Sequence, residues 1–79
     1  GDLIAYPNPF RDELTIHWHG TLPVQSLRIE DANGRLVEVL DCDQMLNGPC
    51  RWVAGGIESG VYFVRAMTAQ GQRTVRVIK

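Results

Sequence analysis

Few residues of this chain have a type and spacing that would allow metal binding. His17 and His19 stand two positions apart, so on a strand both side chains point to the same face, opposite Trp18. Two imidazoles can begin a zinc site, but such a site needs a third and a fourth ligand, and the neighbouring sequence indicates none. We interpret the pair as a solvated or interface-facing stretch of strand and expect no metal.

The sequence does not indicate catalysis either. Ser26 and Ser59 lie in turn-like contexts with no histidine beside them, whereas a serine nucleophile needs a base. The acidic pairs Asp12-Glu13 and Glu30-Asp31 are adjacent residues in strand patterns. Their carboxylates therefore point to opposite faces and do not form a two-carboxylate acid–base site. We expect no enzyme activity and no cofactor.

Trp18 and Trp52 could form a sugar-stacking platform if both indoles were exposed. Trp18 lies in register with the apolar residues Leu14 and Ile16, and Trp52 with Cys50, which favours a place in the core for both.

Cys42 and Cys50 fit neither a CxxC redox pair nor a zinc cluster of four ligands. In an exported protein they can form a disulfide that closes a short loop and contributes roughly 2–3 kcal/mol by the loop-entropy model. Two partly buried free thiols are the alternative.

The composition predicts one small globular domain that covers residues 1–79. The chain has 79 residues, 44% of them hydrophobic, and a net charge of −1. No basic face is visible, which argues against nucleic-acid binding. No run of about 18 apolar residues is present, so we expect no transmembrane segment. The abrupt start at Gly1 indicates a piece of a longer protein whose targeting signals lie elsewhere.

Hydrophobic residues alternate with polar ones along most of the chain, which predicts strands. Residues 27–40 form the clearest hairpin, because Asn33-Gly34 supplies the positive φ of a tight turn; we expect Val37 and Val39 of its second strand to point inward. Further strands are predicted for residues 13–19, 50–53, 61–67 and 72–79. Tyr62, Val64 and Ala66 should share one face of their strand, and Val75 and Val77 should face opposite to Thr74 and Arg76 in the last strand. About seven strands at this spacing predict an all-β sandwich.

Tyr6-Pro7-Asn8-Pro9-Phe10 predicts a rigid, extended corner between the first two strands, since prolines are excluded from helix interiors and central strands. We expect the side chain of Asn8 to bond neighbouring backbone, and Tyr6 and Phe10 to pin the corner to the core. Gly60 is expected to supply an unusual φ just before a core strand.

These motifs together resemble the C-terminal sorting domains of proteins that are exported by the type IX secretion system of certain Gram-negative bacteria. The resemblance covers nearly all 79 residues, in order and in spacing. The matching stretches are Tyr6-Pro7-Asn8-Pro9, Leu14-Thr15-Ile16, residues 27–31 with Asn33-Gly34-Arg35, residues 60–65, and Val75-Arg76-Val77-Ile78-Lys79.

The resemblance implies an immunoglobulin-like β-sandwich at the C-terminus of a larger secreted enzyme or adhesin. It implies that the domain addresses a covalently attached N-terminal cargo to the secretion translocon, and that a sortase-like surface protease then removes it at or before Gly1. The implied localisation is the periplasm in transit, and then the outer-membrane surface or the extracellular space. The residues that the resemblance marks for recognition are Pro7, Asn8, Pro9, Gly34, Gly60, Tyr62, Val75, Val77 and Lys79.

Two other functions stay open at this point. The immunoglobulin-like domain of flagellar hook-capping proteins shares the Pro-Asn-Pro-Phe and Gly-x-Tyr stretches, but its tryptophan is followed by an Asp-Gly turn and a longer loop. Here Val53-Ala54-Gly55-Gly56 follows Trp52, which favours the sorting domain. The second alternative is an accessory module of an extracellular enzyme or adhesin that binds carbohydrate or protein. For sorting, we expect recognition at the exposed edge of the last strand, residues 74–79.

Overall fold

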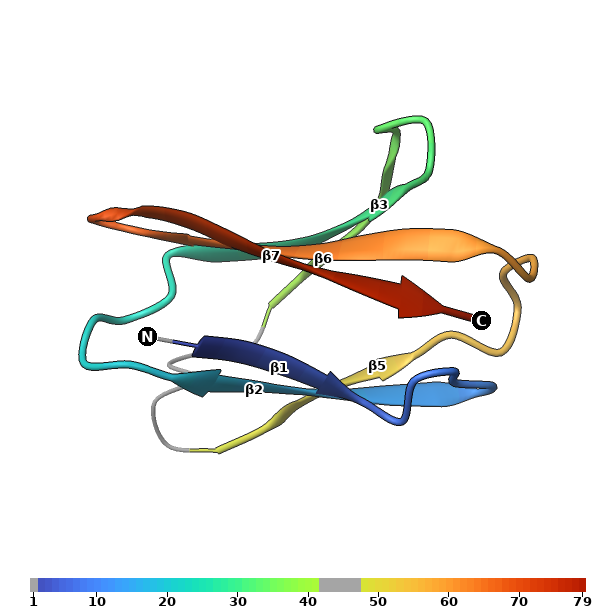
Figure 1. Ribbon diagram of the computed structural model, residues 1–79, viewed down its shortest axis with the longest axis horizontal. Helices are drawn as coiled ribbons and strands as arrows, with labels where there is room; N and C mark the ends of the chain where they lie inside the picture. The colour runs from blue at the N-terminus through green and yellow to red at the C-terminus, as the bar shows by residue number, and fades with distance from the viewer. Residues whose placement is uncertain (1, 42–47) are drawn as a thin grey trace.

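The computed structural model describes residues 2–41 and 48–79, and these form two sheets that face each other as the layers of a sandwich (Figure 1). The smaller sheet has the order β1-β2-β5 and the larger one β4-β3-β6-β7, and all neighbouring strands are antiparallel. The strands are β1 (Asp2–Tyr6), β2 (Glu13–His19), β3 (Ser26–Asp31), β4 (Leu36–Leu40), β5 (Cys50–Val53), β6 (Val61–Thr68) and β7 (Gly71–Ile78).

The prediction of an all-β sandwich with about seven strands is therefore confirmed. The strand order corresponds to an immunoglobulin-like sandwich in which β4 lies beside β3 in the larger sheet. The described residues contain no helix that is long and apolar enough to cross a membrane.

The core lies between the sheets, where the inward-facing residues of both layers meet. Alternation along β2 buries Leu14, Ile16 and Trp18, and alternation along β6 buries every second residue from Tyr62. The predictions of which side chains of β2 and β6 share one face are therefore confirmed. The buried set is Phe10, Leu14, Ile16, Trp18, Leu27, Ile29, Cys50, Trp52, Ala54, Tyr62, Val64, Ala66 and Val77.

The β3–β4 hairpin turns through Ala32, Asn33 and Gly34, which extend as a loop beyond the layers (Figure 1). The carboxylate of Asp31 accepts hydrogen bonds from the backbone N–H groups of Asn33 and Arg35, both at 2.9 Å. Gly34 has a φ of +82°, which a residue with a Cβ rarely adopts. The predicted hairpin and its glycine are confirmed, and the carboxylate of Asp31 stabilises the turn.

The prediction that Val37 and Val39 point inward is wrong, because their exposed fractions are 36% and 59%. A β-bulge shifts the register between Ile29 and Glu30, and one extra residue reverses which side chains face the core. Val39 lies opposite Arg28 on the outer face, and Glu38 lies opposite Ile29. The carboxylate of Glu38 accepts a hydrogen bond from the indole N–H of Trp52 at 3.2 Å.

Candidate functional site

Three segments that are far apart in the sequence meet at one end of the sandwich, where β7 ends. They are the proline corner after β1, the connector from β5 to β6, and the last residues of the sequence. We call the hydrogen-bonded group of Asn8, Phe10, Gly60, Ile78 and Lys79 the terminal clasp. Seven hydrogen bonds tie residues 76–79 to the other two segments.

Asn8 connects the proline corner to the edge of β7. Its amide Nδ2 donates to the carbonyl of Arg76 at 3.2 Å, and its Oδ1 accepts from the backbone N–H of Ile78 at 3.0 Å. The backbone N–H of Phe10 donates to the carbonyl of Ile78 at 2.8 Å. The prediction that Asn8 bonds neighbouring backbone is therefore wrong, because its partners lie about seventy residues away in sequence.

The proline corner lies between β1 and β2, as predicted, and differs from the prediction at Tyr6. The peptide bonds before Pro7 and Pro9 are both cis. Phe10 is buried at 2% exposure and packs against Trp52 and Tyr62. Tyr6, which we expected to pin the corner to the core, is 47% exposed and instead stacks on His17 at 5.9 Å between ring centroids. Tyr6, the last residue of β1, points outward, so Phe10 and not Tyr6 packs the corner into the core.

Replacing Asn8 with alanine should lower the free energy of unfolding by about 1–3 kcal/mol, since two hydrogen bonds to the edge of β7 disappear together. Asn8→Asp is the matched control, because it keeps the acceptor for Ile78 and replaces the donor to Arg76 with a charged carboxylate oxygen. Urea denaturation should place this variant between the wild type and Asn8→Ala. Equal stability of all three proteins would show that Asn8 does not hold β7.

Gly60 and Lys79 form the second part of the clasp. Their backbones exchange two hydrogen bonds, at 3.0 and 2.9 Å, so the β6–β7 ladder continues past the ends of both strands. The ammonium of Lys79 donates to the carbonyls of Ile57 at 2.6 Å and Gly55 at 3.2 Å. These bonds fix the connector from β5 to β6 against the end of the chain. The sequence indicated the importance of Lys79 by its position, but not this role for its side chain.

Tyr62 supports the same connector from inside. Its hydroxyl donates to the carbonyl of Glu58 at 2.6 Å, and its ring packs edge-on against Trp52 at 6.2 Å between centroids. A tyrosine near the start of this strand that bonds back to upstream backbone is the tyrosine corner of immunoglobulin-like sandwiches. The Gly-x-Tyr spacing of residues 60–62 is the sequence signal for this corner.

Not all of the residues marked for recognition come together. Pro7, Asn8, Pro9, Gly60, Tyr62, Val77 and Lys79 lie at or next to the terminal clasp. Val75 is half-buried farther along β7, opposite Val64. Gly34 lies at the tip of the β3–β4 hairpin and makes no contact with the clasp among the described hydrogen bonds. The clasp joins these residues by hydrogen bonds and packing, and its chemistry is that of a binding or structural element.

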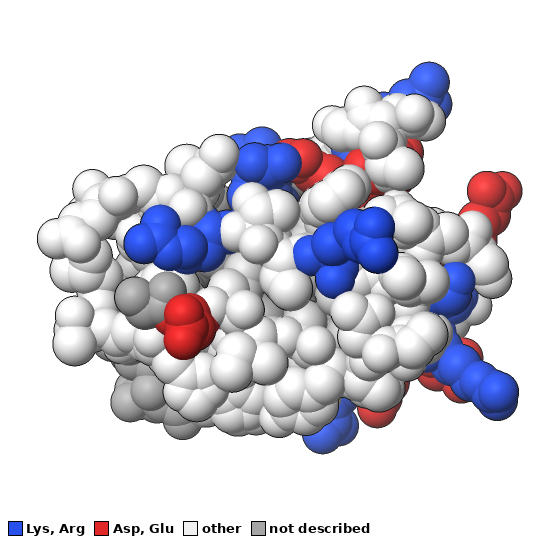
Figure 2. Space-filling model, in the orientation of Figure 1, with Lys and Arg blue, Asp and Glu red and all other residues white. Residues whose placement is uncertain are grey.

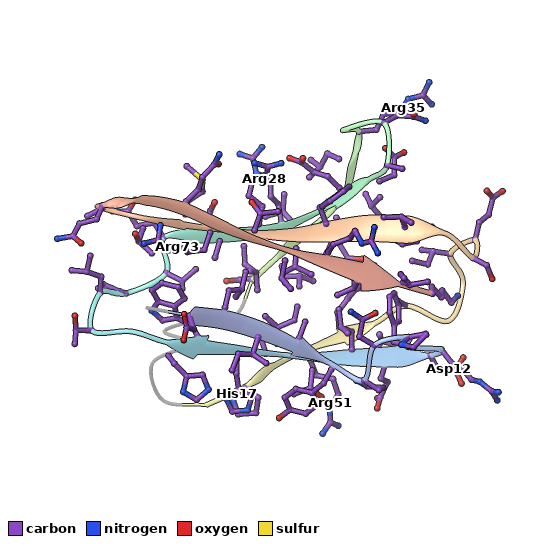
Figure 3. All side chains as sticks on the ribbon, in the orientation of Figure 1. Asp12, His17, Arg28, Arg35, Arg51 and Arg73 are labelled. Carbon is purple, nitrogen blue, oxygen red and sulfur yellow. The ribbon has the colours of Figure 1, made fainter. Side chains whose placement is uncertain are left out.

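The remaining candidates for chemistry are the histidine pair, the two tryptophans and the two cysteines. His17 and His19 stack on each other at 5.6 Å on the outer face of the smaller sheet, where Figure 3 shows His17 pointing away from the core. Within residues 2–41 and 48–79, no three His, Cys, Asp or Glu side chains are grouped to hold a metal ion. Trp18 and Trp52 are 8% and 1% exposed, so both belong to the core as expected. Cys42 lies outside the described residues, and its disulfide with Cys50 stays a prediction.

An open hollow of about 360 Å³ lies beside the clasp, and Ser59 in its lining is a candidate nucleophile. The hollow is lined by Pro9, Phe10, Arg11, Asp12, Ser59 and Lys79. None of these is a histidine, and the lysine ammonium is already held by two carbonyls. The hollow therefore lacks the serine–histidine pair that nucleophilic catalysis commonly uses.

The clasp also narrows the part of β7 that a partner could reach. We expected recognition along residues 74–79, but Asn8 and Phe10 occupy backbone groups of Arg76 and Ile78 on the outer edge. Lys79 is bonded to Gly60 and to the connector. The end of the strand is therefore covered by the protein itself.

Comparison with known families identifies a match over nearly the whole chain. Residues 4–79 match the family model described as the secretion system C-terminal sorting domain. No curated protein and no solved structure matches the chain. The family match includes every segment of the terminal clasp.

Proposed function

Because the chain belongs to the family of secretion system C-terminal sorting domains, we propose that it acts as a folded sorting signal that directs one larger cargo protein through the type IX secretion system. Membership of this family implies attachment to a cargo and export to the cell surface or the extracellular space. The domains of this family are sorting signals and not catalytic domains. The domain therefore works through protein–protein recognition.

In this proposal residues 1–79 are a single C-terminal domain whose cargo precedes Gly1. The cargo reaches the periplasm, the domain binds the secretion translocon, and the cargo passes to the outer-membrane surface. A sortase-like surface protease then separates the domain from the cargo at or before Gly1. In this proposal β7 carries the recognition, and the clasp holds β7 in place.

One observation supports the folded domain as the signal. The motif residues Asn8, Gly60 and Lys79 stand far apart in the sequence, yet their hydrogen bonds converge on the end of β7. A signal that was read as a linear peptide would not require a corner near the start of the domain to bond its last strand. We infer that the translocon binds the last strand as the clasp presents it.

A fusion experiment tests the proposal. A reporter with a periplasmic signal peptide is joined to residues 1–79 and produced in a bacterium with a type IX system, and in a strain that lacks its translocon. We expect the reporter at the cell surface or in the medium only when both the domain and the translocon are present. A reporter that stays in the periplasm of both strains would refute the proposed function.

A further inference from the structure

β7 is an edge strand, and its backbone groups point alternately to β6 and to the open side of the sheet. Gly60 and Lys79 exchange both of their backbone hydrogen bonds, and this fixes the alternation along the whole β6–β7 ladder. Every second residue of β7 from Val77 backwards bonds to β6. The outward-pointing N–H and C=O groups are those of Ile78, Arg76, Thr74 and Gln72.

The proline corner bonds one end of this outward row, and β1, the edge strand of the smaller sheet, contacts β7 on the same side of the sandwich (Figure 1). Asn8 and Phe10 occupy both backbone groups of Ile78 and the carbonyl of Arg76. At the other end, the carbonyl of Gln72 accepts a hydrogen bond from the guanidinium of Arg73 at 3.1 Å. Within the part of the chain that the structure describes, nothing bonds to the N–H or the C=O of Thr74, or to the N–H of Arg76. This open stretch can pair with a strand from another protein.

The open stretch is also the most basic part of the chain. Residues 59–79 contain Arg65, Arg73, Arg76 and Lys79 and no acidic residue. On the same sheet, the guanidinium groups of Arg28 and Arg65 share the carboxylate of Glu30, at 3.7 and 3.2 Å. Among the described residues, no carboxylate lies within ion-pair distance of Arg73 or Arg76.

Arg73 directly precedes Thr74 and Arg76 follows it by two residues, on opposite faces of the strand. A positive charge without a carboxylate partner among the described residues therefore lies beside the open backbone groups on each face. Figure 2 shows basic side chains in two groups along the line of β7, and Figure 3 labels Arg73 in one of them. The opposite edge of the sheet differs in charge, because β4 carries Glu38 at its centre and no basic residue. The carboxylate of Glu38 is bonded to the indole of Trp52, and Arg28 lies opposite Val39. An acidic segment is therefore expected to be attracted more strongly to β7 than to β4.

We propose that the edge of β7 from Gln72 to Arg76 binds an extended acidic segment of the secretion machinery by strand addition. The segment pairs with the free N–H and C=O groups of Thr74, and its carboxylates lie opposite Arg73 and Arg76. This inference rests on the proposed sorting function and specifies the surface that carries it. The terminal clasp has a defined part in the mechanism, since it holds β7 in place while leaving this stretch open.

Thr74→Pro in the reporter fusion tests the inference directly. The N–H of Thr74 takes no part in the β6–β7 ladder, so proline removes the outward donor and blocks strand addition while the fold is kept. Val39→Pro is the matched control, because Val39 lies on the opposite edge of the same sheet and its N–H also points outward. We expect surface export of Thr74→Pro to fall about tenfold, since about 1.4 kcal/mol of lost binding gives that factor, and export of Val39→Pro to match the wild type.

The outcomes separate the inference from the proposed function. Wild-type export of Thr74→Pro, or equal loss from Thr74→Pro and Val39→Pro, would overturn the inference and leave the sorting function intact. Failure of the wild-type fusion to be exported would refute the sorting function, and the inference with it. Thermal melting of each fusion verifies that the domain is folded.

A charge variant tests the same edge of β7 if the Thr74→Pro domain does not fold. The double substitution Arg73→Glu and Arg76→Glu leaves all backbone hydrogen bonds in place and reverses the charge of the edge. We expect export to fall at least as much as for Thr74→Pro, because like charges then oppose the acidic segment. A photo-crosslinker at position 74 should attach to a segment rich in Asp and Glu, whereas a crosslinker at position 39 should not. Normal export of the double variant would contradict the inference. Crosslinking of position 74 to a basic segment of the partner would contradict it as well.

Discussion

Deletion of residues 75–79 should leave the cargo in the periplasm and abolish cooperative unfolding of the domain. The deletion removes Val77, which is fully buried, and a buried valine contributes about 1.5–3 kcal/mol. It also removes all seven hydrogen bonds of the clasp, each worth about 0.5–1.5 kcal/mol. The combined loss approaches the total stability of about 5–15 kcal/mol that a small domain has. Circular dichroism melting and cell fractionation measure the two effects.

Lys79→Met is the matched control for this deletion. It keeps the backbone pairing with Gly60 and removes only the ammonium that bonds the carbonyls of Gly55 and Ile57. We expect a loss of about 1–2 kcal/mol, a domain that still folds, and export close to the wild type. Normal export of the 75–79 deletion would contradict the account, because the last strand would then be dispensable.

Phe10→Ala should destabilise the domain by about 3–5 kcal/mol, the range for loss of a buried aromatic side chain. The Phe10 ring is 2% exposed and packs between two other rings, with centroids 5.7 Å from Trp52 and 6.5 Å from Tyr62. Its backbone N–H is also one of the bonds to β7. In a domain of 79 residues a cavity at this position removes much of the stability. Urea denaturation at 25 °C measures the loss.

Tyr6→Ala is the control from the same motif. Tyr6 is 47% exposed and its ring contacts His17 on the outer face of the smaller sheet. Its loss should lower the free energy of unfolding by no more than about 0.5 kcal/mol, as for an ordinary surface substitution. Similar losses for Phe10→Ala and Tyr6→Ala would show that the corner is not anchored as described.

Alternation of side chains was sufficient to predict the parts of the fold that depend on local pattern. The inward face of β2, the inward face of β6 and the Asn33-Gly34 turn all follow from period-two spacing or turn chemistry. Which side chains of β4 point toward the core was not predictable in this way. A single bulge residue reverses the alternation, and both faces of β4 carry apolar residues, so the pattern does not decide between them.

The site was harder to predict because its bonds join distant segments. The sequence marked Asn8, Gly60 and Lys79 through the family resemblance, but each was assigned a local or terminal role. Asn8 reaches β7 only because the sandwich brings the end of β1 beside the last strand. The lysine ammonium finds its carbonyls only once the β5–β6 connector has folded. Long-range pairing of this kind is a property of the topology, and local residue patterns do not encode it.

The exported fraction of the Phe10→Ala fusion, measured beside the wild type and Tyr6→Ala in the same cells, is the most direct test of the folded domain as the sorting signal. We predict that the wild type and Tyr6→Ala are exported equally and that Phe10→Ala stays in the periplasm in proportion to its unfolded fraction. Immunoblots of the periplasm should show that the full-length fusion is still present there. Wild-type export of Phe10→Ala with an unfolded domain would contradict the account, because the signal would then be read as a linear sequence.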